Sequence, residues 1–239
     1  MQKVGRRGKW LNYILSALWI FSMALSGFFF PYFTDKIDFF KIKALHIEGL
    51  ETIPSEVVVN EIKRFKNNWL FINNTNLLKN LNSVTGNAIG RVKIDRIFSN
   101  GGVTLKVSIE ERKPIFTVIK DDAVYFFDKD GIIFQSQYMK FVKPLVYTHD
   151  IELVRRNFNK LTMLINSLGK GLGEIYVTNL NTVVYTGEGI KITMPPIFLL
   201  NEQVVENVIN TFKVYNIDMN TKELDLNIEG LVIIREVKR

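Results

Sequence analysis

The sequence predicts an α+β protein that consists of a single N-terminal transmembrane helix and two domains outside the membrane. Three observations lead to this fold class. A long apolar stretch lies near the N-terminus, a strand-helix-helix-strand-strand pattern follows it, and the remainder alternates like strands around two further helices. With 239 residues and 47% hydrophobic content, the chain is long enough to form two hydrophobic cores.

Residues 10–33, with the sequence WLNYILSALWIFSMALSGFFFPYF, contain no charged side chain. A run of about 20 apolar residues is enough for a helix to cross a bilayer. The alternative is a cleaved signal peptide, because small residues stand at Ala24 to Gly27. The apolar run continues past these positions to Phe33, which is longer than a typical signal peptide core and favours a retained anchor.

Residues 1–9 form a basic tail in front of the apolar segment. Its cationic side chains are Lys3, Arg6, Arg7 and Lys9. The positive-inside rule therefore predicts that the N-terminus lies in the cytoplasm and that the bulk of the chain lies outside. These four residues are a sizeable part of the formal net charge of +7, so the rest of the chain does not show the concentrated basic surface of a nucleic-acid binder.

Residues 40–112 are expected to form a small domain with the order β-α-α-β-β. Pro54 fits the first turn of the first helix, and Thr75 fits the N-cap of the second. The stretch SNGG separates two alternating runs, RVKIDRIF and VTLKVSIE, and its Asn-Gly pair predicts a β-hairpin. The two helices are expected to cover one face of the resulting sheet.

Residues 113–239 are expected to form a mixed domain built on an antiparallel β meander with two helices. The stretch DKDG at Asp128 to Gly131 predicts a hairpin turn, and residues 151–168 have the spacing of an amphipathic helix. A second helix is expected from Asn201 onward. The runs EIYVT, TVVYT, IKITM, KELDLNI and LVIIREVKR are the expected strands around these helices.

No residue pattern predicts a catalytic site, a cofactor or a metal. The chain has no cysteine, and its two histidines, His46 and His149, are far apart without a nearby carboxylate pattern. The glycines of GKGLGE follow a helix where a phosphate-binding loop would precede one, so they are typical of a helix C-cap. The sequence therefore favours a binding or scaffolding protein over an enzyme.

The order of these segments resembles the FtsQ/DivIB family of bacterial cell-division proteins. Glu111, Arg112 and Pro114 match the family's Glu-Arg-x-Pro signature at the joint between two domains, and Asp128 and Gly131 match an Asp-x-x-Gly hairpin. The stretches that carry the resemblance are KIKALHIEGLETIPSEVVVNEI, VSIEERKPIFTV, VYFFDKDGIIF, KPLVY and KELDLNIEGLVI.

The resemblance implies that the small domain is a POTRA (polypeptide-transport-associated) domain and that the second is the family's β domain. It implies a non-enzymatic, single-pass protein of the cytoplasmic (inner) membrane that is found at the division septum. Its partners would be coiled-coil division proteins of the FtsL and FtsB (DivIC) type, and its role would be to help position septal peptidoglycan synthesis. It would need no cofactor, small-molecule substrate or nucleic acid.

The resemblance also implies that the closing strand is the edge that receives a strand from a partner. The residues of this edge are Leu231, Val232, Ile233, Ile234, Arg235, Glu236 and Val237. An edge strand has unpaired N–H and C=O groups and can accept another chain. The alternative is that Arg235 and Lys238 only protect the edge from aggregation. Asn227 and Ile228, just before this strand, replace an Arg and a Tyr that are common in the family.

Two other functions stay open at this point. POTRA domains also serve in outer-membrane transport systems, although this sequence has a helical anchor and no series of ~10-residue barrel strands. An anchored enzyme would have to assemble its site from residues that are scattered along the chain. Its acid–base candidates would be Asp128, Asp130, His149 and Asp150.

Overall fold

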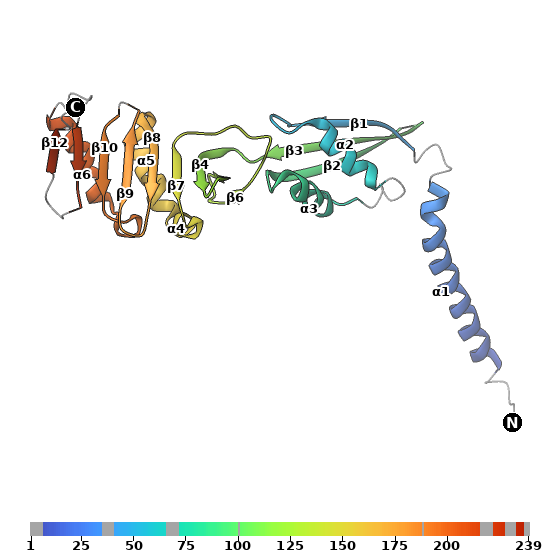
Figure 1. Ribbon diagram of the computed structural model, residues 1–239. Helices are drawn as coiled ribbons and strands as arrows, with labels where there is room; N and C mark the ends of the chain where they lie inside the picture. The colour runs from blue at the N-terminus through green and yellow to red at the C-terminus, as the bar shows by residue number, and fades with distance from the viewer. Residues whose placement is uncertain are drawn as a thin grey trace. The chain divides into compact units, whose positions relative to one another are not determined.

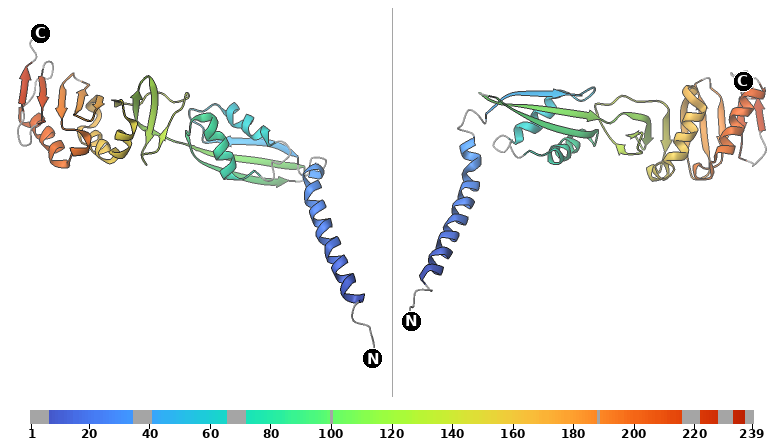
Figure 2. Two further views of the ribbon diagram at one scale, coloured as in Figure 1. Left: turned by 60° about the horizontal axis from the view of Figure 1, so that its bottom comes forward. Right: turned by 180° about the vertical axis from the view of Figure 1, so that it is seen from behind.

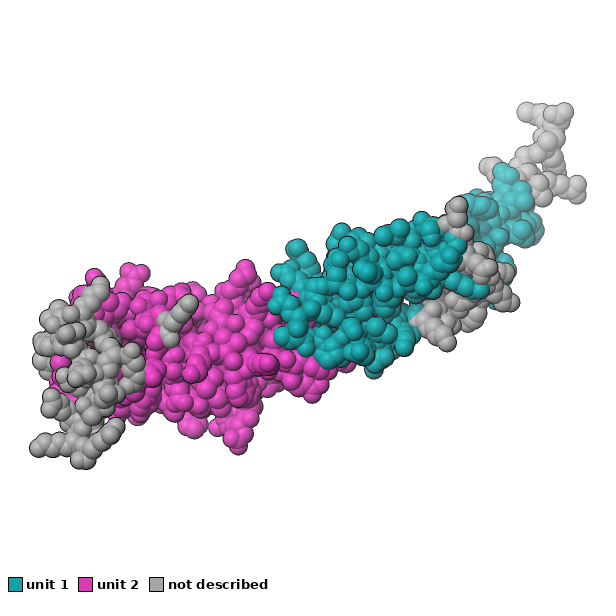
Figure 3. Space-filling view, turned by 90° about the horizontal axis from the view of Figure 1, so that it is seen from above, with its two compact units in different colours: residues 1–81, 89–110 teal, residues 82–88, 111–239 magenta. Residues whose placement is uncertain are grey.

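The structure is a computed structural model that describes residues 7–34, 41–65, 72–99, 101–187, 189–215, 222–227 and 233–236 (Figure 1). The chain forms two compact units (Figure 3). Unit 1 contains residues 1–81 and 89–110, and unit 2 contains residues 82–88 and 111–239. The short segment 82–88 therefore packs with unit 2, although residues of unit 1 precede and follow it.

The N-terminal helix α1 spans Arg7–Thr34. Within it, Asn12–Phe30 form a 19-residue stretch with a mean hydropathy of 1.8, and none of that stretch is buried. The helix is thus long and apolar enough to cross a membrane, as the sequence predicts. Two of the basic residues of the tail, Arg7 and Lys9, belong to the first turn of α1, whereas Lys3 and Arg6 lie outside the described residues.

Unit 1 continues with a three-stranded sheet and two helices. The strand order is β1-β3-β2, and β1 runs parallel to β3. Buried apolar side chains alternate along β3 at Val103, Leu105, Val107 and Ile109, because successive residues of a strand point to opposite faces. The elements are β1 (Ile42–Glu48), α2 (Ser55–Arg64), α3 (Asn74–Thr85), β2 (Ile89–Ser99) and β3 (Gly102–Glu111).

The N-cap of α3 differs from the sequence prediction. Helix α3 begins at Asn74, and the side-chain oxygen Oδ1 of Asn73 accepts a hydrogen bond from the backbone N–H of Asn76 at 2.6 Å. Asn73 is therefore the capping residue, and the prediction that Thr75 caps this helix is wrong. The reason is that Asn73 stands one residue before the helix, where its short carboxamide reaches the third N–H of the first turn.

The described residues of unit 2 form one sheet of nine strands in the order β12-β11-β10-β9-β8-β7-β4-β5-β6. Its strands are β4 (Pro114–Lys120), β5 (Ala123–Asp128), β6 (Ile133–Phe134), β7 (Leu145–Thr148), β8 (Leu172–Val177), β9 (Thr182–Thr186), β10 (Lys191–Met194), β11 (Lys222–Asp225) and β12 (Ile233–Glu236). Its helices are α4 (Ile151–Arg156), α5 (Phe158–Leu168) and α6 (Glu202–Tyr215), with short 3₁₀ turns at Gly169–Gly171 and Ile197–Leu199.

The sheet of unit 2 is mixed, which corrects the prediction of an antiparallel meander. The pairs β4–β7, β7–β8 and β10–β11 are parallel. Parallel neighbours need a crossover connection, and helices supply two of these crossovers. Helices α4 and α5 connect β7 to β8, and α6 connects β10 to β11. The broader prediction of an α+β protein with an N-terminal apolar helix is confirmed.

The helices of unit 2 pack on one face of its sheet (Figure 2). The side chains of Val146, Ile175, Val184, Ile192 and Leu224 lie in register on five neighbouring strands, and all five are fully buried. They share a core cluster with residues of α5 and α6, including Leu161, Leu164, Val205 and Val208. The residues next to them on each strand must therefore point to the opposite face, which we call the open face.

Candidate partner-binding site

Strand β12 is the last strand in the order of the nine-stranded sheet. It pairs with β11 in antiparallel register, so that Leu224 lies opposite Ile234 and Glu223 lies opposite Arg235. Among the described strands, none pairs with the other side of β12. This side has the backbone donors and acceptors that a further strand needs.

Four of the seven residues predicted for the binding edge lie in β12. These are Ile233, Ile234, Arg235 and Glu236. The other three, Leu231, Val232 and Val237, lie outside the described residues, as does Lys238. Of the two positions that depart from the family pattern, Asn227 is exposed and donates its backbone N–H to Oδ1 of Asp225 at 3.1 Å, whereas Ile228 is not described.

Paired charges occupy the open face next to this edge. The Nζ atom of Lys191 lies 2.6 Å from Oε1 of Glu223, and this hydrogen bond raises the pKa of the Lys191 ammonium group. The Nη2 atom of Arg235 lies 3.7 Å from Oδ2 of Asp225. Because Arg235 is paired on the open face with the neighbouring strand, its charge does not lie along the unpaired backbone of β12.

Three tyrosines lie on the open face, one on each of the strands β7, β8 and β9. The rings of Tyr147 and Tyr176 are stacked with centroids 4.7 Å apart, and Tyr185 meets Tyr176 edge-on at 5.6 Å. The hydroxyl of Tyr176 donates a hydrogen bond to Oε2 of Glu174 at 3.0 Å. This hydrogen bond is the main reason that the pKa of Tyr176 rises to about 12. The sequence analysis missed this group, although each tyrosine stands next to a buried residue within an alternating strand.

The Glu-Arg-x-Pro stretch forms a hydrogen-bonded cluster inside unit 2. Arg112 donates from Nη1 to Oδ2 of Asp128 at 2.8 Å and from Nε to the carbonyl oxygen of Asn87 at 3.0 Å. Its backbone N–H donates to the carbonyl oxygen of Ala88 at 2.8 Å. Arg112 therefore links segment 82–88 to the end of β5.

The other carboxylate oxygen of Asp128 shapes the hairpin turn that follows β5. Its Oδ1 atom accepts the backbone N–H groups of Asp130 at 3.0 Å and Ile132 at 2.9 Å. The other two residues of the signature lie at strand ends, because Glu111 is the buried last residue of β3 and Pro114 is the first residue of β4. The cluster stabilises the start of unit 2.

The acid–base candidates of the enzyme hypothesis have other contacts. The Nδ1 atom of His149 lies 3.4 Å from Oδ1 of Asp121, and the imidazole is 94% exposed. Asp150 caps helix α4 by accepting the N–H of Glu152 at 2.9 Å, and Asp128 is paired with Arg112. Within the described part of the chain, no group of three or more His, Asp or Glu residues is placed to hold a metal ion.

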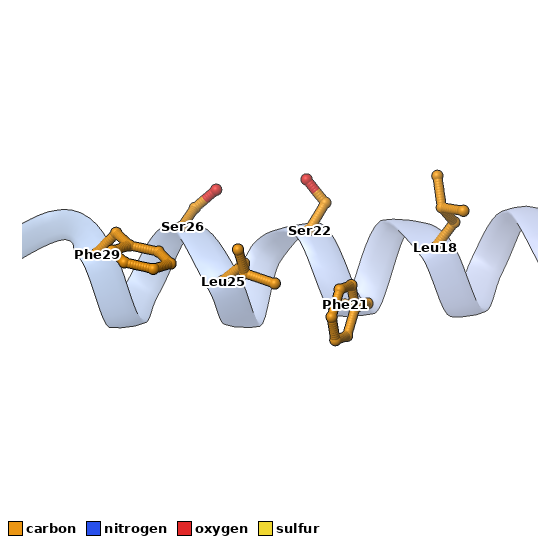
Figure 4. Close-up of a pocket in the computed structure, with 6 residues that line it drawn as sticks. All are labelled: Leu18, Phe21, Ser22, Leu25, Ser26 and Phe29. Atoms are coloured by element: carbon orange, nitrogen blue, oxygen red, sulfur yellow. The ribbon is translucent and has the colours of Figure 1, made fainter.

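One side of helix α1 has a shallow hollow between its side chains (Figure 4). Leu18, Phe21, Leu25 and Phe29 supply its apolar walls, and the hydroxyls of Ser22 and Ser26 lie between them. All of these residues belong to one helix. A single helix has no opposite wall that could enclose a small molecule, so the hollow is part of an apolar surface rather than a ligand site.

Comparison with known proteins finds similarity to two proteins. An uncharacterized protein of Aquifex aeolicus is 23% identical over 219 residues, which cover 91% of this chain and 96% of that protein. Cell division protein DivIB of Clostridium acetobutylicum is 27% identical over 100 residues, which cover 42% of this chain and 39% of that protein. The match therefore spans less than half of the DivIB chain. No protein-family model matches this sequence.

Proposed function

We propose that this protein is a non-enzymatic, membrane-anchored scaffold of the bacterial division machinery that acts like FtsQ/DivIB proteins. The observation that carries the proposal is the 27% identity to a DivIB protein over 100 residues. An apolar N-terminal helix that could span a membrane is consistent with the single anchor that such a scaffold needs. The rest of unit 1 and the whole of unit 2 provide surfaces for binding other proteins.

In this proposal, residues 1–9 are a cytoplasmic tail and residues 10–33 cross the membrane. Residues 40–112 are a POTRA-like domain, and residues 113–239 are a β domain of the FtsQ type. The order β1-α2-α3-β2-β3 in the first of these segments supports the POTRA assignment. The excess of basic residues before the apolar segment supports the orientation with the N-terminus inside.

The proposed binding site is the unpaired side of β12. A partner strand added there would extend the nine-stranded sheet by backbone hydrogen bonds. The proposed partners are coiled-coil proteins of the FtsL and FtsB (DivIC) type, and binding would help to position septal peptidoglycan synthesis. The open-face pairs Lys191–Glu223 and Asp225–Arg235 lie beside this edge and could select a partner strand by its charges.

A localisation experiment tests the proposed role in living cells. A fluorescent fusion to the full chain is expected to gather at mid-cell while the septum forms. A fusion that lacks residues 1–33 should lose the membrane signal, since the anchor would be missing. A full-length fusion that is functional but stays evenly spread over the membrane throughout septation would contradict the division role.

A further inference from the structure

The end of unit 1 at which β2 turns into β3 has an exposed group of apolar side chains. We call this end the β2–β3 tip and define it as residues 41–43 together with residues 97–99, 101 and 102. The two segments lie together, because Ile42 is in register with Val103 and the N–H of Val103 donates to the carbonyl oxygen of Lys41 at 2.8 Å. The start of β1 thus lies beside the turn between β2 and β3.

The apolar residues of the tip are not covered by the helices of unit 1. Ile97 is 54% exposed, Phe98 is 46% exposed and Ile42 is 39% exposed. At the opposite end of β2, Ile89 and Val92 are buried. Figures 1 and 2 show that the strands extend beyond α2 and α3 at the tip, which explains the difference. Ile97 and Phe98 are consecutive residues of β2, so the tip exposes large apolar side chains on both faces of the sheet.

Two cationic side chains flank this apolar group on the side of β1. Lys41 and Lys43 are both exposed. The ammonium group of Lys43 lies over the turn, since a Cβ atom placed on Gly101 would be 2.3 Å from its Nζ atom. Apolar and aromatic side chains flanked by lysines match the chemistry of a membrane surface, where acyl chains lie beneath anionic phosphate groups.

The length of the connection to α1 restricts where the tip can go. Only residues 35–40 separate Thr34, the last residue of α1, from Lys41. Seven peptide units span at most about 25 Å when they are fully extended, at 3.3–3.6 Å per residue. If α1 crosses a bilayer, Lys41 at the edge of the tip must therefore stay within about 25 Å of the end of that helix.

We infer that the β2–β3 tip rests on the outer surface of the membrane that holds α1. Ile97, Phe98 and Ile42 contact the boundary between head groups and acyl chains, and Lys41 and Lys43 face anionic phosphates. The inference depends on the proposed membrane anchoring, and it adds a second membrane contact that orients unit 1. Glu110, near the opposite end of β3, lies about 26 Å along the strand from Gly102. It is therefore expected to lie away from the membrane surface.

The test uses the full chain in vesicles of phosphatidylethanolamine and phosphatidylglycerol. Because the chain has no cysteine, a single introduced cysteine can carry a nitroxide spin label. Labels are placed at Ser99→Cys in the tip, at Glu110→Cys as the matched control on the same hairpin, and at Leu18→Cys in α1. For each label, the rate of collision with dissolved oxygen, which enters the bilayer, is compared with the rate of collision with a water-soluble nickel chelate.

The inference predicts that the Ser99 label is shielded from nickel at least ~3-fold more than the Glu110 label. Changing Ile97 and Phe98 together to serine should remove this difference, and phosphatidylcholine vesicles should reduce it because they lack net anionic charge. A Ser99 label as accessible to nickel as the Glu110 label would overturn the inference. If the Leu18 label lies in the bilayer in that case, the proposed anchor stands. A Leu18 label in water would overturn both.

Discussion

The Nη1 atom of Arg112 lies 2.8 Å from Oδ2 of Asp128, and this ion pair joins the stretch after β3 to the hairpin after β5. The side chains of Arg112 and Asp128 are only 15% and 6% exposed. Both charges are therefore largely removed from water, and each depends on the other for compensation. Arg112 of the Glu-Arg-x-Pro stretch and Asp128 of the Asp-x-x-Gly hairpin thus contact each other directly.

Replacing Arg112 by alanine is expected to destabilise unit 2 strongly. The substitution would leave the Asp128 carboxylate buried without a cation, which typically costs about 3–5 kcal/mol. The measurement is the free energy of unfolding in guanidinium chloride for the segment 35–239. The matched control is Asp130→Ala, which breaks the exposed pair with Lys129, whose two side chains are 83% and 62% exposed. That change should cost less than about 1 kcal/mol.

Equal losses of stability in these two variants would show that the Arg112–Asp128 pair is no more important than a surface contact. Because the segment contains two units, the transition of unit 2 has to be followed separately. With Trp69 of unit 1 changed to phenylalanine, the fluorescence of a tryptophan introduced at Phe158, which packs against Phe127 in the core of unit 2, would report on that transition.

Gly86 is expected to be far less tolerant of alanine than Gly169, although both have a φ of +68°. A Cβ atom on Gly86 would lie 1.4 Å from the carbonyl oxygen of Gln135, whereas a Cβ atom on Gly169 would meet nothing within 4 Å. With a ψ of −154°, Gly169 lies in a region that is almost restricted to glycine, where alanine costs about 1–3 kcal/mol by itself. Gly169→Ala should lose about this amount of stability, and Gly86→Ala should lose clearly more.

The measurement is the free energy of unfolding of Gly86→Ala and of Gly169→Ala, each compared with the wild type. The difference between them isolates the close approach of segment 82–88 to Gln135, whose N–H also donates to the carbonyl oxygen of Gly86 at 2.8 Å. Similar losses in both variants would contradict the close packing of this segment within unit 2.

The Tyr176 hydroxyl is expected to ionise at about pH 12, because its hydrogen bond to Glu174 favours the protonated form. Tyrosine in an unfolded chain ionises near pH 10. The stabilisation from this hydrogen bond is therefore fully present below about pH 10 and is lost as the pH rises through about 12. The measurement is the absorbance of tyrosinate at 295 nm during a titration of the folded protein.

Glu174→Gln should move the late-titrating component back toward pH 10, since the neutral amide does not repel a phenolate. Tyr185→Phe serves as the control, because it removes only the hydroxyl of a neighbouring ring and leaves the hydrogen bond between Tyr176 and Glu174. A titration that is the same in the wild type and in Glu174→Gln would show that the carboxylate does not control this tyrosine.

The element types and most of their positions could be predicted from local sequence patterns. The apolar segment, the glycine that ends α5 and the Asp128–Gly131 turn are all short-range signals, and α1, Gly169 and the β5–β6 turn agree with them. Strand direction in unit 2 could not be predicted in this way. It depends on whether the helices cross between strands, which is a long-range property of packing that residue alternation does not encode.

The contacts of the candidate site were harder to predict than its position. The sequence identified Arg112 and Asp128 as separate motif residues, but their ion pair requires the chain between them to return on itself through β4 and β5. The carbonyl oxygen of Asn87 has no sequence signal at all, because any residue supplies a backbone oxygen. The tyrosines of the open face become a group only when β7, β8 and β9 are in register.

The proposed binding edge can be tested by proline substitutions at two adjacent positions of β12. Successive N–H groups along an antiparallel strand point alternately toward one neighbour and the other. Of Ile234→Pro and Arg235→Pro, one variant should therefore lose a hydrogen bond to β11, and the other should lose only a donor on the unpaired side. The thermal unfolding temperatures identify the second variant, which should stay close to the wild type.

The most direct test of the scaffold role is the affinity of the segment 35–239 for the ectodomains of the same organism's coiled-coil division proteins of the FtsL and FtsB (DivIC) type, measured by calorimetry. The wild type should bind, and the stable proline variant should bind at least ~10-fold more weakly, because strand addition would lose a backbone hydrogen bond. Equal affinity of the wild type and this variant would exclude the β12 edge as the binding site. No binding by the wild type would contradict the proposed scaffold function itself.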